Sequence, residues 1–134
     1  MNQFPKGDRG GNSIPLVRGS NLHSLWDNLL GRQHFMRDVD KTVVELADQQ
    51  QFSDVWESAA EEIDPRRWAQ ESHVLCESFV YDAAILNTVR ATPAGSEISK
   101  IELPAAYYKA AGEKARQRVI AAGAWLGKLL SGSP

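Results

Sequence analysis

The chain has 134 residues, of which 43% are hydrophobic and 24% are charged, and its net charge is -2. These values are typical of a globular protein, here one domain over residues 1–134, and so small a charge predicts no sequence-independent attraction to nucleic acid. The lone cysteine, Cys76, excludes an internal disulfide, and no run of about 18 apolar residues predicts a membrane span. The first residues also lack the charged-then-apolar pattern of a signal peptide.

Residues 1–20 are rich in glycine and proline and predict a loop with a short extended piece at 13–17. Within this loop, Gly10 and Gly11 permit backbone angles that other residues avoid. The pair indicates either an ordinary turn or a place where the backbone closely approaches a ligand or the next helix.

A short helix is predicted to follow, capped by Asn21 or Ser20 and ended by Gly31. His23 and Asp27 are four residues apart, so both side chains project from one helical face. An imidazole nitrogen and a carboxylate oxygen each bind zinc at about 2.0–2.2 Å, so one ion could lie between them. A catalytic zinc normally takes three protein ligands, so this pair alone does not complete a site. The alternative interpretation is an exposed ion pair or a helix cap.

Two shorter helices are predicted in the middle of the chain. One begins at Asp38, and the other covers 54–61 with Val55 and Trp56 facing inward. The helix from Asp38 carries an apolar stripe that consists of Val39, Val43, Val44, Leu46 and Ala47.

Two long helices complete the predicted fold. Asp64 caps a helix that continues through about Val89, because apolar residues recur near heptad spacing. Those residues are Trp68, Leu75, Phe79, Ala83 and Leu86. After a connection at 91–102, a final helix is predicted from Pro104 to about Leu130. Its predicted buried face consists of Tyr108, Ala111, Ala115, Val119, Ala122, Leu126 and Leu129. The sequence therefore predicts an all-α fold with at least four helices, a loop-rich entry and negligible sheet.

Four motifs, in one order along the chain, point to a known family. They are D-R-G-G-N at 8–12, N-L-H-S-L-W-D at 21–27, W-A-Q-E-S at 68–72 and a closing helix at 121–130. Together they resemble the zinc-dependent, single-strand-specific S1/P1 nucleases of the phospholipase C/P1 nuclease superfamily. The resemblance covers nearly the whole chain and implies a multi-helix bundle of that type.

The resemblance also implies an activity and a cofactor. Relatives hydrolyse single-stranded DNA and RNA to 5′-phosphorylated products and hold a cluster of three zinc ions. One of these ions is bound by the histidine and aspartate that match His23 and Asp27. Full-length relatives are exported, which implies a secreted or periplasmic parent protein. The absence of an Asn-x-Ser/Thr sequon favours a bacterial source.

Two further residues receive roles only through the resemblance. Asn28 directly follows the predicted ligand Asp27 and could donate a hydrogen bond to a substrate phosphate. Glu71 could orient a zinc-bound histidine as an outer hydrogen-bond acceptor, and the alternative is a surface or capping glutamate. The remaining histidines, His34 and His73, are predicted to be surface residues rather than ligands.

Other family features are not found in this sequence. Relatives begin with a tryptophan whose amino group binds metal, and an H-D-x-G-D-x-H-Q-P-L-H segment precedes their Gly-Gly-Asn stretch. The chain therefore resembles the C-terminal portion of such a nuclease, with at most one partial zinc site. We expect the isolated chain to be inactive. The alternative function is a non-catalytic helical interaction module from a truncated nuclease. Apolar faces left uncovered would then favour a homo-oligomer or association with the missing N-terminal segment.

Overall fold

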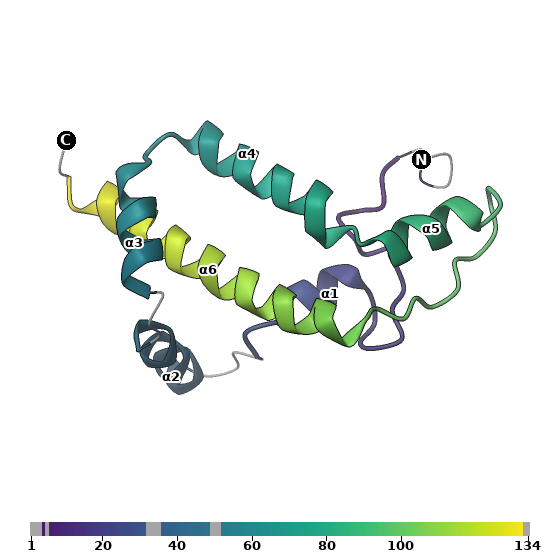
Figure 1. Cartoon of the computed structure of the whole chain (residues 1–134), viewed down its shortest axis with the longest axis horizontal. Helices are drawn as coiled ribbons and strands as arrows, with labels where there is room; N and C mark the ends of the chain where they lie inside the picture. Colours follow the sequence, from purple (N-terminus) through teal and green to yellow (C-terminus); the bar gives the residue numbers. More distant parts are fainter. Residues whose placement is uncertain (1–3, 5, 32–35, 49–51, 133–134) are drawn as a thin grey trace. The chain divides into compact units, whose positions relative to one another are not determined.

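A computed structural model describes residues 4, 6–31, 36–48 and 52–132 of the chain (Figure 1). The described residues form six α-helices and no β-strand, which confirms the predicted all-α fold. The helices are α1 (Leu22–Asp27), α2 (Met36–Ala47), α3 (Phe52–Glu61), α4 (Pro65–Leu75), α5 (Ala83–Ala91) and α6 (Ala105–Leu130). A π-helical turn, η1 (Cys76–Val80), directly follows α4.

The described residues divide into two compact units, each treated by itself below. The first unit takes its residues from 1–29 and 73–111, and the second takes them from 30–72 and 112–134. One boundary follows α1, and the other two fall within α4 and α6. The predicted metal ligands belong to the first unit.

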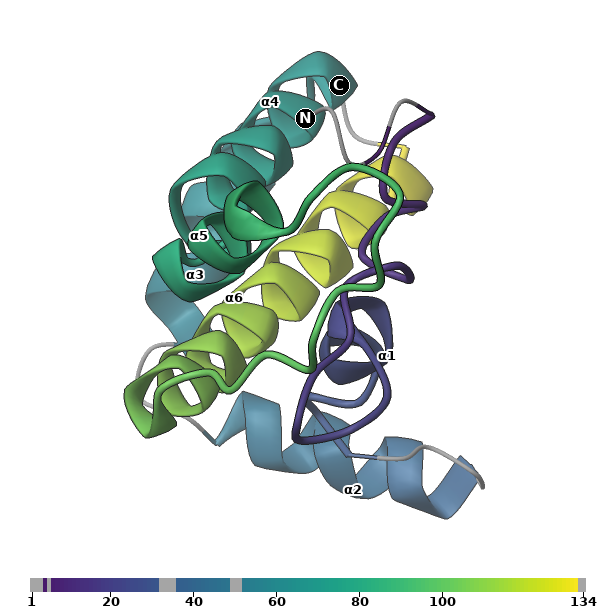
Figure 2. The same ribbon diagram turned by 90° about the vertical axis from the view of Figure 1, so that its right-hand side faces the viewer.

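In the first unit, the segment after α5 lies beside the N-terminal loop (Figure 2). Leu16 and Ile101 form an isolated parallel bridge, in which Val17 N donates to Ile101 O at 2.9 Å and Ile101 N donates to Pro15 O at 3.0 Å. These bonds satisfy buried backbone groups without a sheet. The extended piece predicted at 13–17 is therefore fixed against a segment about 85 residues further along the chain.

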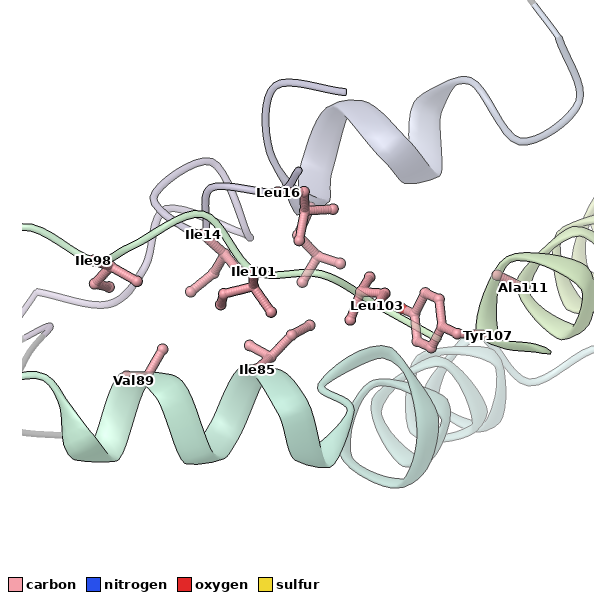
Figure 3. Packing of buried hydrophobic residues seen from close by; sticks show 10 residues of the cluster. Ile14, Leu16, Ile85, Val89, Ile98, Ile101, Leu103, Tyr107 and Ala111 are labelled. Carbon is pink, nitrogen blue, oxygen red and sulfur yellow. The ribbon is translucent and has the colours of Figure 1, made fainter. Parts of the chain in front are cut away.

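A hydrophobic core holds this loop in place against α5. Ile14 and Leu16 from the loop, Ile85 and Val89 from α5, and Ile101 from the later segment are at most 4% exposed. Figure 3 shows Ile85 and Val89 pointing from α5 toward Ile14, Ile98 and Ile101. Burying one such side chain fully stabilises the fold by about 1.5–3 kcal/mol. The core therefore anchors the loop that leads into α1.

Helix α1 begins as predicted but ends early. The Asn21 side chain accepts a hydrogen bond from Ser24 N at 2.8 Å, and Leu22 is 2% exposed and fixes the helix against the core. The helix ends at Asp27 rather than near Gly31, and Asn28 N donates to Leu25 O at 3.2 Å. A turn follows, so the helix that carries the predicted ligands is only six residues long.

The long helix predicted from Asp64 through about Val89 is wrong, because the structure interrupts it after Leu75. Tyr81 N donates to Cys76 O, five residues earlier, at 3.2 Å, which makes the turn π-helical. Asp82 then caps α5 by accepting from Ala84 N at 2.8 Å. The break changes the register of the buried face, so Ala83 is exposed instead of buried.

Ala111 of α6, which lies in the first unit, is buried as predicted, but in the second unit the predicted buried face of α6 is wrong. Val119, Leu126 and Leu129 are 46%, 57% and 58% exposed. The face that is buried instead consists of Ile120, Ala121, Ala124 and Trp125. Trp125 stacks on Trp68 of α4 with ring centroids 4.6 Å apart. Each tryptophan side chain can bury about 150–250 Å² of surface, so the stacked pair favours this register.

The two middle helices bury little of their predicted apolar surface. Val43 and Val44 of α2 are 58% and 59% exposed, and Leu46 alone is buried. In α3, Val55 is half-buried and Trp56 is 37% exposed. A Cβ on Gly123 or Gly127 of α6 would lie 3.6 or 3.7 Å from the Trp56 ring, an ordinary contact distance, so the ring packs against this side of α6.

Candidate metal centre

His23 and Asp27 lie on one face of α1, as their spacing predicts. His23 Nε2 is 3.3 Å from Asp27 Oδ2, and the two side chains are 50% and 63% exposed. Two ligands of a tetrahedral zinc ion, each at about 2.0–2.2 Å, lie about 3.3–3.6 Å apart. The pair therefore fits two adjacent ligand positions of a zinc ion and remains open to solvent. Its role as a ligand pair stays a prediction.

A backbone carbonyl determines which imidazole nitrogen is available. His23 Nδ1 is 3.1 Å from Gly10 O, and a carbonyl oxygen only accepts, so Nδ1 carries the hydrogen. In the neutral imidazole, Nε2 then presents a lone pair to the Asp27 carboxylate. Two electron-rich groups at this distance repel each other unless a proton or a cation lies between them. Zinc-binding histidines commonly donate their second N–H to a carbonyl in this way.

The two glycines before α1 make the close approach to His23 possible. Gly10 and Gly11 have positive φ angles of 65° and 86°. A Cβ on Gly11 would lie 3.1 Å from His23 N and 3.2 Å from Leu22 Cβ, closer than nearly all real Cβ contacts. The loop is therefore a turn that also approaches the next helix closely, which joins the two alternatives predicted from the sequence.

Two side chains that receive no role from the sequence, Asp8 and Tyr81, hold this loop. Asp8 Oδ1 accepts from Gly10 N at 3.1 Å, and Asp8 Oδ2 accepts from the Tyr81 hydroxyl at 2.5 Å. Burial, followed by the hydrogen bond to Asp8, raises the pKa of Tyr81 well above its usual range, so the hydroxyl stays a donor. Asp8 has a local signal, because an Asp two residues before a glycine turn is typical of an Asx turn. Tyr81 has none, since it is 73 residues away.

Helix α1 is also held by Tyr107, through Trp26. Trp26 Nε1 donates to the Tyr107 hydroxyl at 3.1 Å, and that hydroxyl donates to Val80 O at 2.9 Å. Burial raises the pKa of Tyr107 to about 12. The neutral hydroxyl therefore joins α1 to the residue that precedes Tyr81.

The comparison with known families agrees with the motifs. The model of the S1/P1 Nuclease family matches residues 2–133. The chain belongs to the S1/P1 nuclease family. No curated protein and no solved structure matches it. Family membership confirms the resemblance in the motifs and supports a nuclease function, in a family that is generally zinc-dependent.

The other residues singled out in this S1/P1 chain have partners of their own or lie outside the described residues. Asn28 is exposed, and its Nδ2 donates to Ser24 O at 2.7 Å. Glu71 belongs to the second unit, where its Oε2 is 2.8 Å from Arg118 Nη1, and its outer-acceptor role stays a prediction. His73 is 63% exposed and pairs with Glu77 at 3.4 Å, and His34 lies outside the described residues.

Within the described ranges, no three or more His, Cys, Asp or Glu side chains gather where they could hold a metal ion. As a zinc site, the pair on α1 would therefore offer two ligands and need at least one more. In the same ranges, no helix combines the length and apolar character needed to cross a membrane.

Proposed function

We propose that this S1/P1 chain provides part of the zinc centre of an endonuclease that hydrolyses single-stranded DNA and RNA to 5′-phosphorylated products. The observation that carries the proposal is the geometry of His23 and Asp27. Nε2 and Oδ2 are spaced as two zinc ligands, and the Gly10 carbonyl directs the lone pair of Nε2 toward the carboxylate. Zinc bound there supplies Lewis-acid stabilisation of charge on a phosphodiester.

The other contribution of the chain is to position the zinc ion and the substrate. His23 and Asp27 hold one ion of the family's three-ion cluster, and their exposure leaves room for substrate on the same face. Asn28 uses one amide hydrogen on Ser24 O, and an amide nitrogen carries two. We assign its second hydrogen to a phosphate oxygen of the single-stranded substrate.

The 134-residue chain by itself is expected to bind zinc weakly and to show no measurable nuclease activity. A catalytic zinc needs three protein ligands to hold the ion and lower the pKa of bound water, and α1 offers two. The family's H-Q-P-L-H segment is the expected source of the others.

The decisive experiment compares this chain with a version extended upstream through that segment, both given single-stranded DNA and zinc. The extended version should cleave, its His23→Ala variant should not, and His73→Ala should cleave normally. His73 is a matched control because it also forms an exposed i, i+4 pair with a carboxylate. Equal cleavage by the short and extended chains would contradict the proposal.

We also propose an exported bacterial parent protein: the family resemblance implies export, and the absence of an Asn-x-Ser/Thr sequon favours a bacterial source. The DNA immediately upstream of codon 1 should then encode an in-frame H-Q-P-L-H and, further upstream, a signal peptide. Upstream DNA without either feature would instead favour the second candidate.

The second candidate is a non-catalytic interaction module, and the exposed side of α6 favours it. Val119, Leu126, Leu129 and Leu130 are 46–77% exposed and recur at helical spacing. A contiguous apolar stripe of this kind usually marks an interface. Leu126→Lys with Leu129→Lys should abolish concentration-dependent association in analytical ultracentrifugation, whereas Ile63→Lys, outside α6, should not. A monomer at all concentrations before mutation would exclude this candidate.

A further inference from the structure

The loop before α1 is held in a backbone conformation that its residues do not favour. Arg9 has a positive φ of 61°, the only described residue other than glycine that does, and Gly10 follows at 65°. A non-glycine residue in this region is uncommon and persists only when its surroundings hold it. Asp8 is the side chain placed to do so, because it bonds Gly10 N across the strained residue.

Each oxygen of Asp8 has its own partner. Oδ1 accepts from Gly10 N at 3.1 Å, and Oδ2 accepts from the Tyr81 hydroxyl at 2.5 Å. The carbonyl of the same Gly10 then accepts from His23 Nδ1 at 3.1 Å. A continuous hydrogen-bonded path therefore leads from Tyr81 to the imidazole.

Tyr81 is itself well fixed. Its backbone N donates to Cys76 O at 3.2 Å, which closes the π-helical turn, and the preceding Val80 O accepts from Tyr107. Tyr107 also accepts from Trp26 of α1. Tyr81 is thus connected to α1 in two ways: through Asp8 and Gly10 to His23, and through the neighbouring Val80 and Tyr107 to Trp26. These connections hold α1 and the loop before it in fixed positions relative to each other.

We propose that Tyr81 is a positioning residue for His23: through Asp8 and Gly10 it sets the tautomer and orientation of the imidazole that faces Asp27. The inference rests on the proposed function in taking His23 as a zinc ligand. Without the Tyr81 hydroxyl, half-buried Asp8 loses one partner, and the side chain that restrains the strained turn is no longer fixed in place. The Gly10 carbonyl then no longer selects the tautomer with the hydrogen on Nδ1.

The test uses the 134-residue chain and two tyrosine variants. Tyr81→Phe removes the hydroxyl of the path, and Tyr108→Phe is the matched control, because the Tyr108 hydroxyl is buried without a hydrogen-bond partner in the described part of the molecule. Nitrogen-15 NMR of the histidine ring, at about pH 8.5 where an ordinary imidazole is neutral, reports which nitrogen is protonated. Isothermal titration calorimetry reports zinc affinity.

We expect His23 to carry its hydrogen on Nδ1 in the unmodified chain and in Tyr108→Phe. In Tyr81→Phe the hydrogen should shift toward Nε2, and zinc affinity should fall about tenfold, near the lower end of effects for outer partners of metal ligands. Asp8→Asn, which offers one oxygen for two donors, should reproduce both changes and is measured in place of Tyr81→Phe if that variant does not fold.

Several results would overturn the inference. They are a hydrogen on Nε2 in the unmodified chain, an unchanged tautomer in Tyr81→Phe and Asp8→Asn, or equal changes in Tyr108→Phe. Failure of the proposed function is distinguishable, because a chain that binds no zinc still reports its tautomer. Zinc binding that is lost in His23→Ala but unaffected by Tyr81→Phe would contradict the positioning role and leave the metal site intact.

Discussion

At the scale of single residues, the hydroxyl of Tyr107 connects more of the first unit than any predicted site residue. It accepts from Trp26 Nε1 and donates to Val80 O, and its residue is 5% exposed. Removing a buried group that satisfies two partners leaves both without a hydrogen bond.

Tyr107→Phe should therefore lower the free energy of unfolding by about 1–3 kcal/mol. The adjacent Tyr108→Phe should change it little, because the Tyr108 hydroxyl has no partner among the described residues. Urea denaturation of the two variants beside the unmodified chain measures the difference. Equal losses would show that ring packing, rather than the bridging hydroxyl, stabilises this region.

For single residues of the site, the sequence predicts some contacts and not others. His23 and Asp27 are a local pair, so helical periodicity alone places them together. Asp8 and Tyr81 meet across 73 residues, and no local pattern predicts such a contact. The predicted ligand pair is therefore easier to find from the sequence than the Asp8–Tyr81 contact that holds the loop before it.

At the scale of elements, helix termini explain the main errors in the predicted fold. Apolar spacing continues through 76–82, but the carbonyl of Val80 bonds a side chain and Asp82 supplies a new cap. Asp82 is a typical N-cap residue and so indicates a helix start, but the heptad pattern favours one continuous helix. Alanines occur on all sides of α6, so apolar periodicity alone does not predict which face of the helix is buried.

The cap on α5 gives a prediction at this scale. Asp82→Ala should lower the free energy of unfolding by about 0.5–2 kcal/mol, because Ala84 N loses its acceptor. Asp82→Asn keeps an oxygen in place and should retain most of the stability. Circular dichroism during chemical denaturation distinguishes the two, and an equal loss in both variants would contradict a capping role.

At the scale of the whole molecule, family membership is predicted from the motifs, because four of them occur in one order over nearly the whole chain. The division into two compact units is not predicted, since it depends on contacts between distant segments. The central claim is that the metal chemistry of this S1/P1 chain is concentrated on the six residues of α1.

Zinc titration of the unmodified chain, His23→Ala and His73→Ala tests that claim most directly. His73 and Glu77 repeat the spacing and exposure of His23 and Asp27, with a nitrogen-to-oxygen distance of 3.4 Å against 3.3 Å, so chance binding to an i, i+4 pair would affect both variants alike. We expect weak binding by the unmodified chain that is lost in His23→Ala and retained in His73→Ala. Binding that survives His23→Ala, or that falls equally in both variants, would contradict the claim.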